Sequence, residues 1–336
     1  MSELLRLGII GCGSWGKNYV RSFGTLEEVK LAGLCDLSSK RLESLHRRLP
    51  GAVITTDYRK LLDKTDAVCI ATEAVSHFKI ARDALQAGKD VLVEKPLATS
   101  VEECERLVEM AAKKGRILMV GHVFLFNRAV SVLKGYMSDG VLGKIYYIHA
   151  TRTNLGPIRK DVNAVWDLAP HDISTISYLV GAQPLEVSAT GSSYLSDGVQ
   201  DMAFISMRYP DDISANVHVS WLYPRKTRET TIIGSKKMAV FDDVSTLEKI
   251  KLFDKGVMKE PAYDSYGDFQ LSLRSGDITI PNVEVKEPLL AECAHFINCV
   301  LKRERPLSDG VEGLNVVRVI DAITKSIRMS GNPVAV

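Results

Sequence analysis

The chain has 336 residues, enough for two domains with sizeable cores. Hydrophobic residues make up 46% and charged residues 25%, an ordinary composition for a soluble globular protein. A net charge of +2 gives no electrostatic case for binding nucleic acid or a membrane, and no apolar stretch approaches the length of a transmembrane span. Because the first ten residues run directly into a glycine-rich loop, we expect no signal peptide and a cytoplasmic location.

The six cysteines are scattered and form no C-x-x-C pair. Most of them fall inside apolar segments, which favours buried free thiols over a disulfide framework or a metal site. We therefore expect no metal. The six are Cys12, Cys35, Cys69, Cys104, Cys293 and Cys299.

The glycine-rich loop lies between an apolar run, residues 7–10, and a predicted helix over residues 16–23. Gly11 allows a tight turn, Gly13 lets a phosphate approach the backbone, and Gly16 lets the helix pack closely on the strand. The helix start offers free N–H groups and a positive dipole to a pyrophosphate. The loop therefore predicts a dinucleotide site made by Gly11, Gly13, Ser14, Trp15 and Gly16.

An acidic residue follows the next predicted strand, residues 29–35. Asp36 lies twenty residues beyond Gly16, where a carboxylate accepts hydrogen bonds from the adenosine ribose. This favours NAD. Lys40 and Arg41 follow closely enough to leave NADP, with its 2′-phosphate, as an alternative. The alternative for the whole motif is an ordinary strand, turn, helix and strand without a ligand.

Short apolar runs alternate with amphipathic stretches up to residue 121, which is typical of βαβ units. Strands are predicted at residues 67–71, 91–93 and 117–120. A capping box of Ser100 and Glu103 starts a helix between the last two, and Gly115 ends it. Residues 1–121 therefore predict an α/β Rossmann domain with a doubly wound parallel sheet. Glu94-Lys95-Pro96 leaves the strand at 91–93, so Lys95 is expected in the ligand crevice.

The pattern changes after residue 121. Strands at residues 144–152, 185–194, 202–209, 213–220, 230–233 and 237–241 predict a largely antiparallel sheet. One helix, residues 166–180, interrupts them, and helices at 289–301 and 313–329 follow. Residues 254–286 read as a long loop. We expect an α+β domain over residues 122–310 and a C-terminal helical segment over residues 311–336.

Asp167 and His171 lie four residues apart in the interrupting helix, so their side chains share one face. The carboxylate would raise the basicity of the imidazole. Pro170 fits a first helical turn, which would place His171 near the positive end of the helix and lower the basicity of the imidazole. The result would be a base that works near neutral pH. The alternative is that Asp167 caps the helix and His171 is a satisfied, partly buried histidine.

These motifs together resemble the Gfo/Idh/MocA family of oxidoreductases over essentially the full length. The resemblance is carried by the glycine loop, by residues 72–77 as the loop ending in the family histidine, by Glu94-Lys95-Pro96, and by Asp167 with His171. It implies a Rossmann domain followed by a mixed sheet that binds substrate and mediates homo-oligomers, with a final helix that packs back on the first domain. Three positions depart from the family pattern: Glu73, Ala169 and Ser174.

The resemblance implies roles for several residues. Lys95, Asp167 and His171 would be catalytic, with the choice of Lys95 or His171 as the formal base open. Glu94 would contact the nicotinamide ribose, and Thr72 and His77 would lie beside the cofactor, although a plain helix-start role for His77 is an equal alternative.

Residues 154–172 are similar to members of nucleotide-sugar pathways. In that group Arg159 would bind an anion and Asn163 sugar hydroxyls, with Trp166 beside them; the alternative is that they are loop residues. We therefore expect an NAD(P)-dependent oxidoreductase acting on a secondary alcohol of a sugar, with a UDP-sugar favoured. The alternatives are a myo-inositol or aldose dehydrogenase, a ketosugar reductase, and a non-catalytic sugar sensor.

Overall fold

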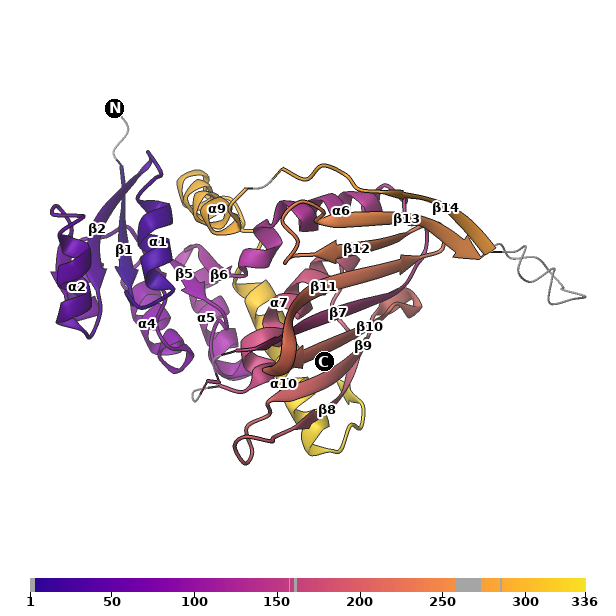
Figure 1. Ribbon diagram of the computed structural model, residues 1–336. Coiled ribbons are helices and arrows are strands. Elements are labelled where there is room, and N and C mark those ends of the chain that lie inside the picture. Colours follow the sequence, from indigo (N-terminus) through magenta and orange to yellow (C-terminus); the bar gives the residue numbers. More distant parts are fainter. Residues whose placement is uncertain (1–3, 157, 160–161, 258–272, 285) are drawn as a thin grey trace, which may run out of the picture. The chain divides into compact units, whose positions relative to one another are not determined.

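The computed structural model describes residues 4–156, 158–159, 162–257, 273–284 and 286–336. The contacts divide the chain into two compact units (Figure 1). The first comprises Met1–Phe126 and Lys286–Arg318, and the second comprises Asn127–Val285 and Val319–Val336. These units differ from the expected boundaries, because residues 286–310 pack with the first unit and the last boundary falls inside the final helix.

The first unit contains a six-stranded sheet in which all pairs are parallel, in the order β3-β2-β1-β4-β5-β6. The strands are β1 Leu5–Ile10, β2 Val29–Cys35, β3 Val53–Thr55, β4 Ala67–Ile70, β5 Asp90–Glu94 and β6 Leu118–Gly121. The order reverses between β1 and β4, and ligands bind at such a switch point outside the carboxyl ends of the strands. The predicted doubly wound parallel sheet is thus confirmed.

Helices connect these strands, namely α1 Gly16–Phe23, α2 Ser39–His46, α3 Tyr58–Leu62, α4 Ala74–Gln86 and α5 Val101–Lys114, with the short η1 Val123–Phe126 after β6. The predicted capping of α5 is confirmed, since the Ser100 hydroxyl accepts from the Glu103 N–H at 3.2 Å. The Glu103 carboxylate accepts from the Thr99 N–H at 3.3 Å. Gly115 ends the helix with a φ of 58°, which suits glycine.

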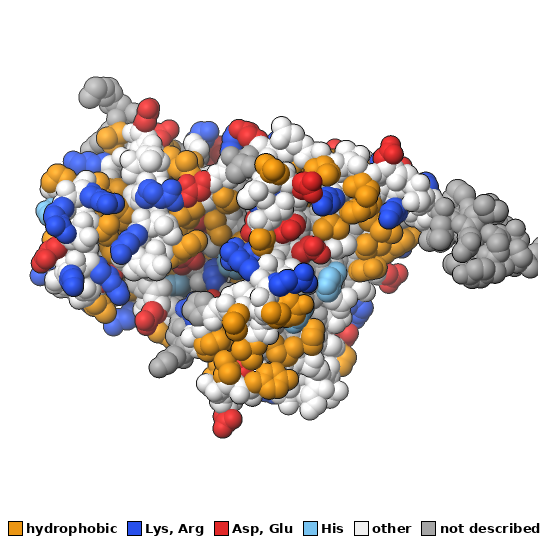
Figure 2. Space-filling view, viewed as in Figure 1, with side chains coloured by type: hydrophobic (Ala, Val, Ile, Leu, Met, Phe, Trp, Pro, Cys, Tyr) orange, Lys and Arg blue, Asp and Glu red, His pale blue; other side chains and the backbone are white. Residues whose placement is uncertain are grey.

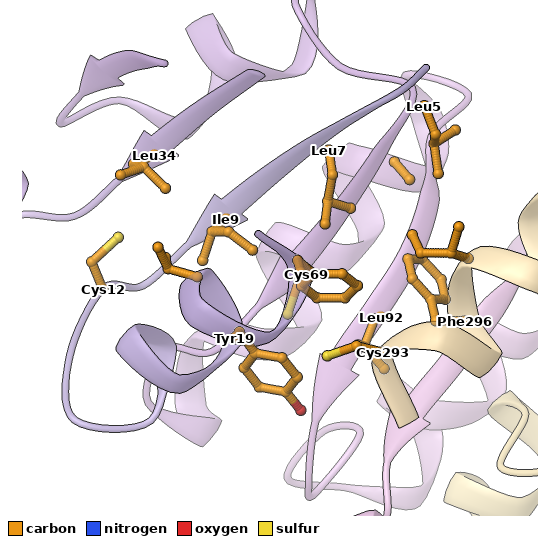
Figure 3. Packing of buried hydrophobic residues seen from close by; sticks show 14 of the residues in the cluster. Leu5, Leu7, Ile9, Cys12, Tyr19, Leu34, Cys69, Leu92, Cys293 and Phe296 are labelled. Atoms are coloured by element: carbon orange, nitrogen blue, oxygen red, sulfur yellow. The ribbon is translucent and has the colours of Figure 1, made fainter. Parts of the chain in front are cut away.

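A helix from the end of the chain completes the core of this unit. α9, Pro288–Lys302, packs against α1, and Figure 3 shows Cys293 and Phe296 of α9 beside Leu92 of β5. The rings of Phe23 and Phe296 meet edge to face, with centroids 6.4 Å apart. Burying each such side chain stabilises the folded state by roughly 2 kcal/mol. α9 therefore contributes to the core of the first unit, to which it belongs. All six cysteines are buried and free, as predicted.

The second unit is built on a nine-stranded sheet in the order β14-β13-β12-β11-β7-β10-β9-β8-β15. Its strands are β7 Ile145–Leu155, β8 Glu186–Ser192, β9 Met202–Arg208, β10 Ser214–Ser220, β11 Leu222–Gly234, β12 Met238–Asp242, β13 Ile250–Val257, β14 Leu273–Thr279 and β15 Val334–Ala335. β7 and β10 pair in parallel while the other recorded pairs of this sheet are antiparallel. The predicted, largely antiparallel mixed sheet is confirmed.

The helices of this unit are α6 Arg128–Ser138, α7 Ala164–Val180 and the short η2 Pro210–Asp212, and α10 Gly310–Arg328 crosses the boundary between the units. α7 packs against β7, β9 and β10. α7 is the predicted interrupting helix, whereas α6, which precedes β7, was not predicted. The long loop predicted at residues 254–286 was wrong in part, since β13 ends and β14 runs within it; residues 258–272 lie outside the described residues.

Within the described ranges, no helix is long and apolar enough to cross a membrane.

Candidate active site and cofactor site

The glycine loop follows β1 and has the shape of a phosphate cradle. Gly11 has a φ of 91°, and a Cβ there would lie 2.5 Å from the Ala71 carbonyl oxygen. A Cβ at Gly16 would overlap the Gly11 carbonyl oxygen, whereas a Cβ at Gly13 would enter open space. The loop therefore keeps an open surface at Gly13 and admits no side chain at its two ends. A pyrophosphate fits this arrangement, which also contains Ser14 and Trp15.

Asp36 follows β2 and is fixed beside this loop. Its Oδ2 accepts from the Cys12 N–H and its Oδ1 accepts from the Ser38 N–H, both at 2.8 Å. The Arg41 guanidinium lies 3.6 Å from Oδ1. These contacts hold the carboxylate at the carboxyl end of β2, where a ribose hydroxyl can donate to its remaining lone pairs.

Glu94, at the end of β5, lies in a buried cluster with two aromatic side chains. Its Oε1 accepts hydrogen bonds from Trp15 Nε1 and from the Tyr19 hydroxyl, and its Oε2 accepts from the Lys95 N–H at 3.0 Å. Burial raises the pKa of Glu94 to about 7, although the Tyr19 hydrogen bond and the Lys95 charge oppose this. The carboxylate is thereby tied to the glycine loop through Trp15.

Sequence reasoning missed two members of this cluster, Tyr19 of α1 and Glu292 of α9. The Tyr19 hydroxyl lies 3.1 Å from Glu292 Oε2, and both side chains are fully buried. A glutamate among the apolar positions of a predicted core helix was the available signal for Glu292.

His77 links the loops that follow β4 and β5. The residue lies in the first turn of α4 and is buried. Its Nδ1 lies 2.7 Å from the Pro96 carbonyl oxygen, and its Nε2 lies 3.2 Å from the Thr72 carbonyl oxygen. The Thr72 hydroxyl accepts in turn from Ser76 at 2.7 Å. His77 thus holds the segment that carries Lys95, whose peptide bond to Pro96 is cis.

His122 follows β6, the strand beside β5, and was not predicted as a site residue. Burial, with the Lys95 charge, lowers the pKa of His122 to about 3, so its imidazole is neutral. Neither ring nitrogen has a hydrogen-bond partner among the described residues.

In the second unit, α7 begins earlier than predicted. Asn163 is its N-cap and accepts from the Trp166 N–H at 3.0 Å, while its side-chain amide donates to Gln200 at 2.6 Å. Pro170 therefore lies inside the helix, and His171 lies beyond the first turn. The expected influence of the helix N-terminus on His171 was wrong, because that effect fades within one turn.

Asp167 lies in the first turn of α7, and residues outside this helix bind its carboxylate. Its Oδ1 accepts from the Arg159 guanidinium at 3.0 Å, and its Oδ2 accepts from Trp221 Nε1 at 3.2 Å. Trp221 is buried and was missed from the sequence. The network fixes the carboxylate on the helix that also carries His171, whose carbonyl oxygen accepts from Thr175 at 2.7 Å.

The neighbouring Asp172 has a structural partner. It forms a bidentate pair with Arg152 of β7, with N···O distances of 2.8 and 2.9 Å, and both side chains are buried. Asp172 therefore anchors α7 to the sheet.

The predicted site residues fall into two groups. The first unit holds the glycine loop, Asp36, Thr72, His77, Glu94 and Lys95, and the second holds Arg159, Asn163, Trp166, Asp167 and His171. A joint action of Lys95 with Asp167 and His171 remains a prediction.

Comparisons with known proteins give two family matches. Residues 5–122 match an oxidoreductase family with an NAD-binding Rossmann fold, and residues 130–240 match the GFO/IDH/MocA C-terminal domain. The chain is 27% identical over 316 residues to UDP-N-acetylglucosamine 3-dehydrogenase of Acidithiobacillus ferrooxidans, covering 93% of this chain and 94% of the relative.

Two further relatives also match most of the chain. Myo-inositol 2-dehydrogenase of Thermotoga maritima is 24% identical over 330 residues, covering 86% of this chain and 99% of the relative. The crystal structure of the WlbA dehydrogenase from Bordetella pertussis, in complex with NADH and UDP-GlcNAcA, has a TM-score of 0.81 at 22% identity and covers 99% of each chain. The fold is therefore shared along nearly the whole chain.

Proposed function

Because the chain belongs to the Gfo/Idh/MocA family of NAD-binding oxidoreductases, we propose that it oxidises a secondary alcohol of a sugar, with NAD as the hydride acceptor. The observation that carries this proposal is the loop at Gly11, Gly13 and Gly16, which leaves an open phosphate cradle beside the fixed carboxylate of Asp36. NAD supplies hydride transfer when it is bound, and the protein supplies binding, orientation and proton transfer.

The substrate is a nucleotide-linked sugar. This choice is supported by the relative that acts on UDP-N-acetylglucosamine, which matches along almost its whole length. The Arg159 side chain is 38% exposed, and a guanidinium is suited to binding an anionic part of the substrate. The polar atoms of Asn163 are already engaged in capping α7 and in the contact with Gln200, and sugar binding there needs that contact to open.

His171 takes the proton of the reacting hydroxyl, and Lys95 polarises the same oxygen. Asp167, held by Arg159 and Trp221, orients His171 or the substrate hydroxyl. Lys95 shares in the relay of this proton, and either residue can act as the formal base.

A homo-oligomer is part of this proposal, as is a cytoplasmic location. Along β7, Ile148 and Ala150 are buried, while Tyr147 on the opposite face is 44% exposed; Phe204 of β9 is 54% exposed. Figure 2 shows hydrophobic side chains gathered over the part of the second unit around β8 and β9. His218 of β10 stacks on Phe204, with ring centroids 4.5 Å apart. An exposed aromatic sheet face of this kind favours association with a second copy.

The test is the reduction of NAD, followed by nicotinamide absorbance, with a panel of UDP-sugars, free aldoses and inositols. We expect turnover with a UDP-sugar, and loss of turnover in Lys95→Ala and in His171→Ala. Lys113→Ala, at an exposed position of α5, is the matched control and keeps activity. NADH binding by both inactive variants would show that they are folded.

Other results would redirect the proposal. Turnover confined to inositols or free aldoses would replace the nucleotide-sugar substrate with a free polyol. Tight NADH binding without turnover in either direction, including reduction of ketosugars, would contradict the enzyme and favour a sugar sensor.

A further inference from the structure

Two buried carboxyl groups lie on either side of a single tyrosine hydroxyl in the first unit. Tyr19 lies 2.7 Å from Glu94 Oε1 and 3.1 Å from Glu292 Oε2, both measured from its hydroxyl oxygen. Tyr19 and Glu292 are fully buried, and Glu94 is 7% exposed. The three groups come from α1, the end of β5 and α9, so the contact joins parts of the chain that are distant in sequence.

The two hydrogen bonds at the Tyr19 hydroxyl require a proton on one of the carboxyl groups. A tyrosine hydroxyl carries one hydrogen, and an ionised carboxylate only accepts. Two hydrogen bonds at Tyr19 therefore need a second hydrogen, which one glutamate must supply. Burial raises the pKa of Tyr19 well above its ordinary value, so the phenol keeps its own proton.

The surroundings decide which glutamate carries the proton. Glu94 accepts from three donors, Trp15 Nε1, the Tyr19 hydroxyl and the Lys95 N–H, and donors favour the ionised form. Glu292 has no cation among its recorded partners, and its Oε1 has no hydrogen-bond partner among the described residues. Burial raises the pKa of Glu292 well above its ordinary value. The proton therefore belongs to Glu292.

We propose that Glu292 is a protonated positioning residue whose O–H donates to Tyr19, so that the Tyr19 O–H donates to Glu94 and holds that carboxylate ready for the nicotinamide ribose. The inference rests on the proposed function, since the cofactor contact of Glu94 is part of it. Linked donors polarise one another, which strengthens the bond to Glu94.

The backbone beside the contact between Tyr19 and Glu94 leaves no room for a side chain at Gly121. Gly121 pairs with Glu94 across β5 and β6, and a Cβ at this position would lie 2.9 Å from the Tyr19 hydroxyl and 3.3 Å from Glu94 Cδ. The backbone at Gly121 therefore packs closely against the hydroxyl and the carboxylate, and a side chain at this position would disturb their contact.

The titratable groups that face the contact determine how it responds to pH. Lys95 favours ionised Glu94. Cys69 of β4 and Cys293 of α9 are neutral thiols, since burial raises the pKa of each, and His122 after β6 is a neutral imidazole. Glu94 is thus the group of this cluster that changes charge near neutral pH. Protonation of Glu94 removes an acceptor of ribose hydroxyls, so NADH affinity is expected to fall as the pH drops below about 7.

The first experiment uses the cofactor-free protein and infrared spectroscopy. At a pH above the pKa of Glu94, we expect the carbonyl band of a buried protonated carboxylic acid, and its loss in Glu292→Gln. Glu94→Gln is the matched control and keeps the band. Absence of the band in the unsubstituted protein, or its persistence in Glu292→Gln, would overturn the assignment whatever the protein catalyses.

The second experiment measures NADH affinity against pH. In Glu292→Gln the amide N–H donates to Tyr19 in place of the acid, so the affinity and the midpoint of its pH dependence stay near those of the unsubstituted protein. Glu292→Leu leaves Tyr19 without a donor, and we expect affinity about tenfold weaker. Tyr19→Phe removes the bridge; its midpoint is expected to rise, because Glu94 loses a donor that favours ionisation.

The outcomes separate the two proposals. If the unsubstituted protein does not bind NADH, the proposed function fails and the infrared result still decides the protonation of Glu292. If NADH binds equally well to the unsubstituted protein, Glu292→Leu and Tyr19→Phe, the positioning role is wrong. An acidic shift of the midpoint in Glu292→Gln would mean that Glu292 is ionised, and would also overturn it.

Discussion

The buried pair of Arg152 and Asp172 gives the sharpest prediction about stability. Their side chains are 7% and 3% exposed and share two hydrogen bonds. Asp172→Ala leaves the Arg152 guanidinium buried without this partner, and removing one member of a buried pair lowers the free energy of unfolding by roughly 3–5 kcal/mol. Burial, and then the charge of Arg152, lowers the pKa of Arg228, and the charge of Asp172 partly offsets this shift. Asp172→Ala is therefore expected near the upper end of that range.

The assay is urea unfolding of the second unit, followed by the fluorescence of Trp166 and Trp221. Trp15→Phe, introduced throughout, removes the signal of the first unit. The matched control is Glu186→Ala, which breaks a pair with Arg208 whose side chains are 37% and 56% exposed and 3.5 Å apart; its loss should stay below about 1 kcal/mol. A loss as small in Asp172→Ala would refute the reasoning.

Four further outcomes are expected. Gly16→Ala should abolish NADH binding, because its Cβ overlaps a backbone carbonyl of the loop; binding is measured by calorimetry. Asp36→Ser should raise affinity for NADP relative to NAD by at least about tenfold, since it removes a carboxylate that repels the 2′-phosphate and leaves Arg41 to bind it. The contribution of Glu94 to the stability of the cofactor-free protein should fall by roughly 3 kcal/mol as the pH rises from 4.5 to 7, because the folded state holds the Glu94 proton up to a pKa of about 7. The decline measured by thermal unfolding at each pH should therefore be smaller by that amount in Glu94→Gln, while the decline due to protonated Glu292 remains. Phe204→Glu should reduce the mass measured by light scattering, because it places a charge on the exposed aromatic face.

The features predicted correctly from the sequence are those that depend on residues close together along the chain. Periodicity and turn residues indicated the strands and helices of the first unit, and the Ser100 cap formed as expected. The start of α7 was misplaced, because Pro170 was interpreted as a first-turn residue while the Asn163 side chain caps the helix. β14 was missed because Leu273–Thr279 is mostly polar and glycine-containing, without the apolar alternation that identifies a strand.

Partners that are distant along the chain explain the remaining differences. Trp221 lies 54 residues from Asp167 in sequence and binds its second carboxylate oxygen, a contact that helical spacing cannot predict. Glu292 lies 273 residues from Tyr19, in a helix whose apolar face alone predicts core packing. A helix pattern cannot say which strand end the helix will reach, so it cannot say that a polar residue on that face will meet Glu94. The chemistry of the cofactor site therefore depends on tertiary contacts that are completed only when α9 packs against α1.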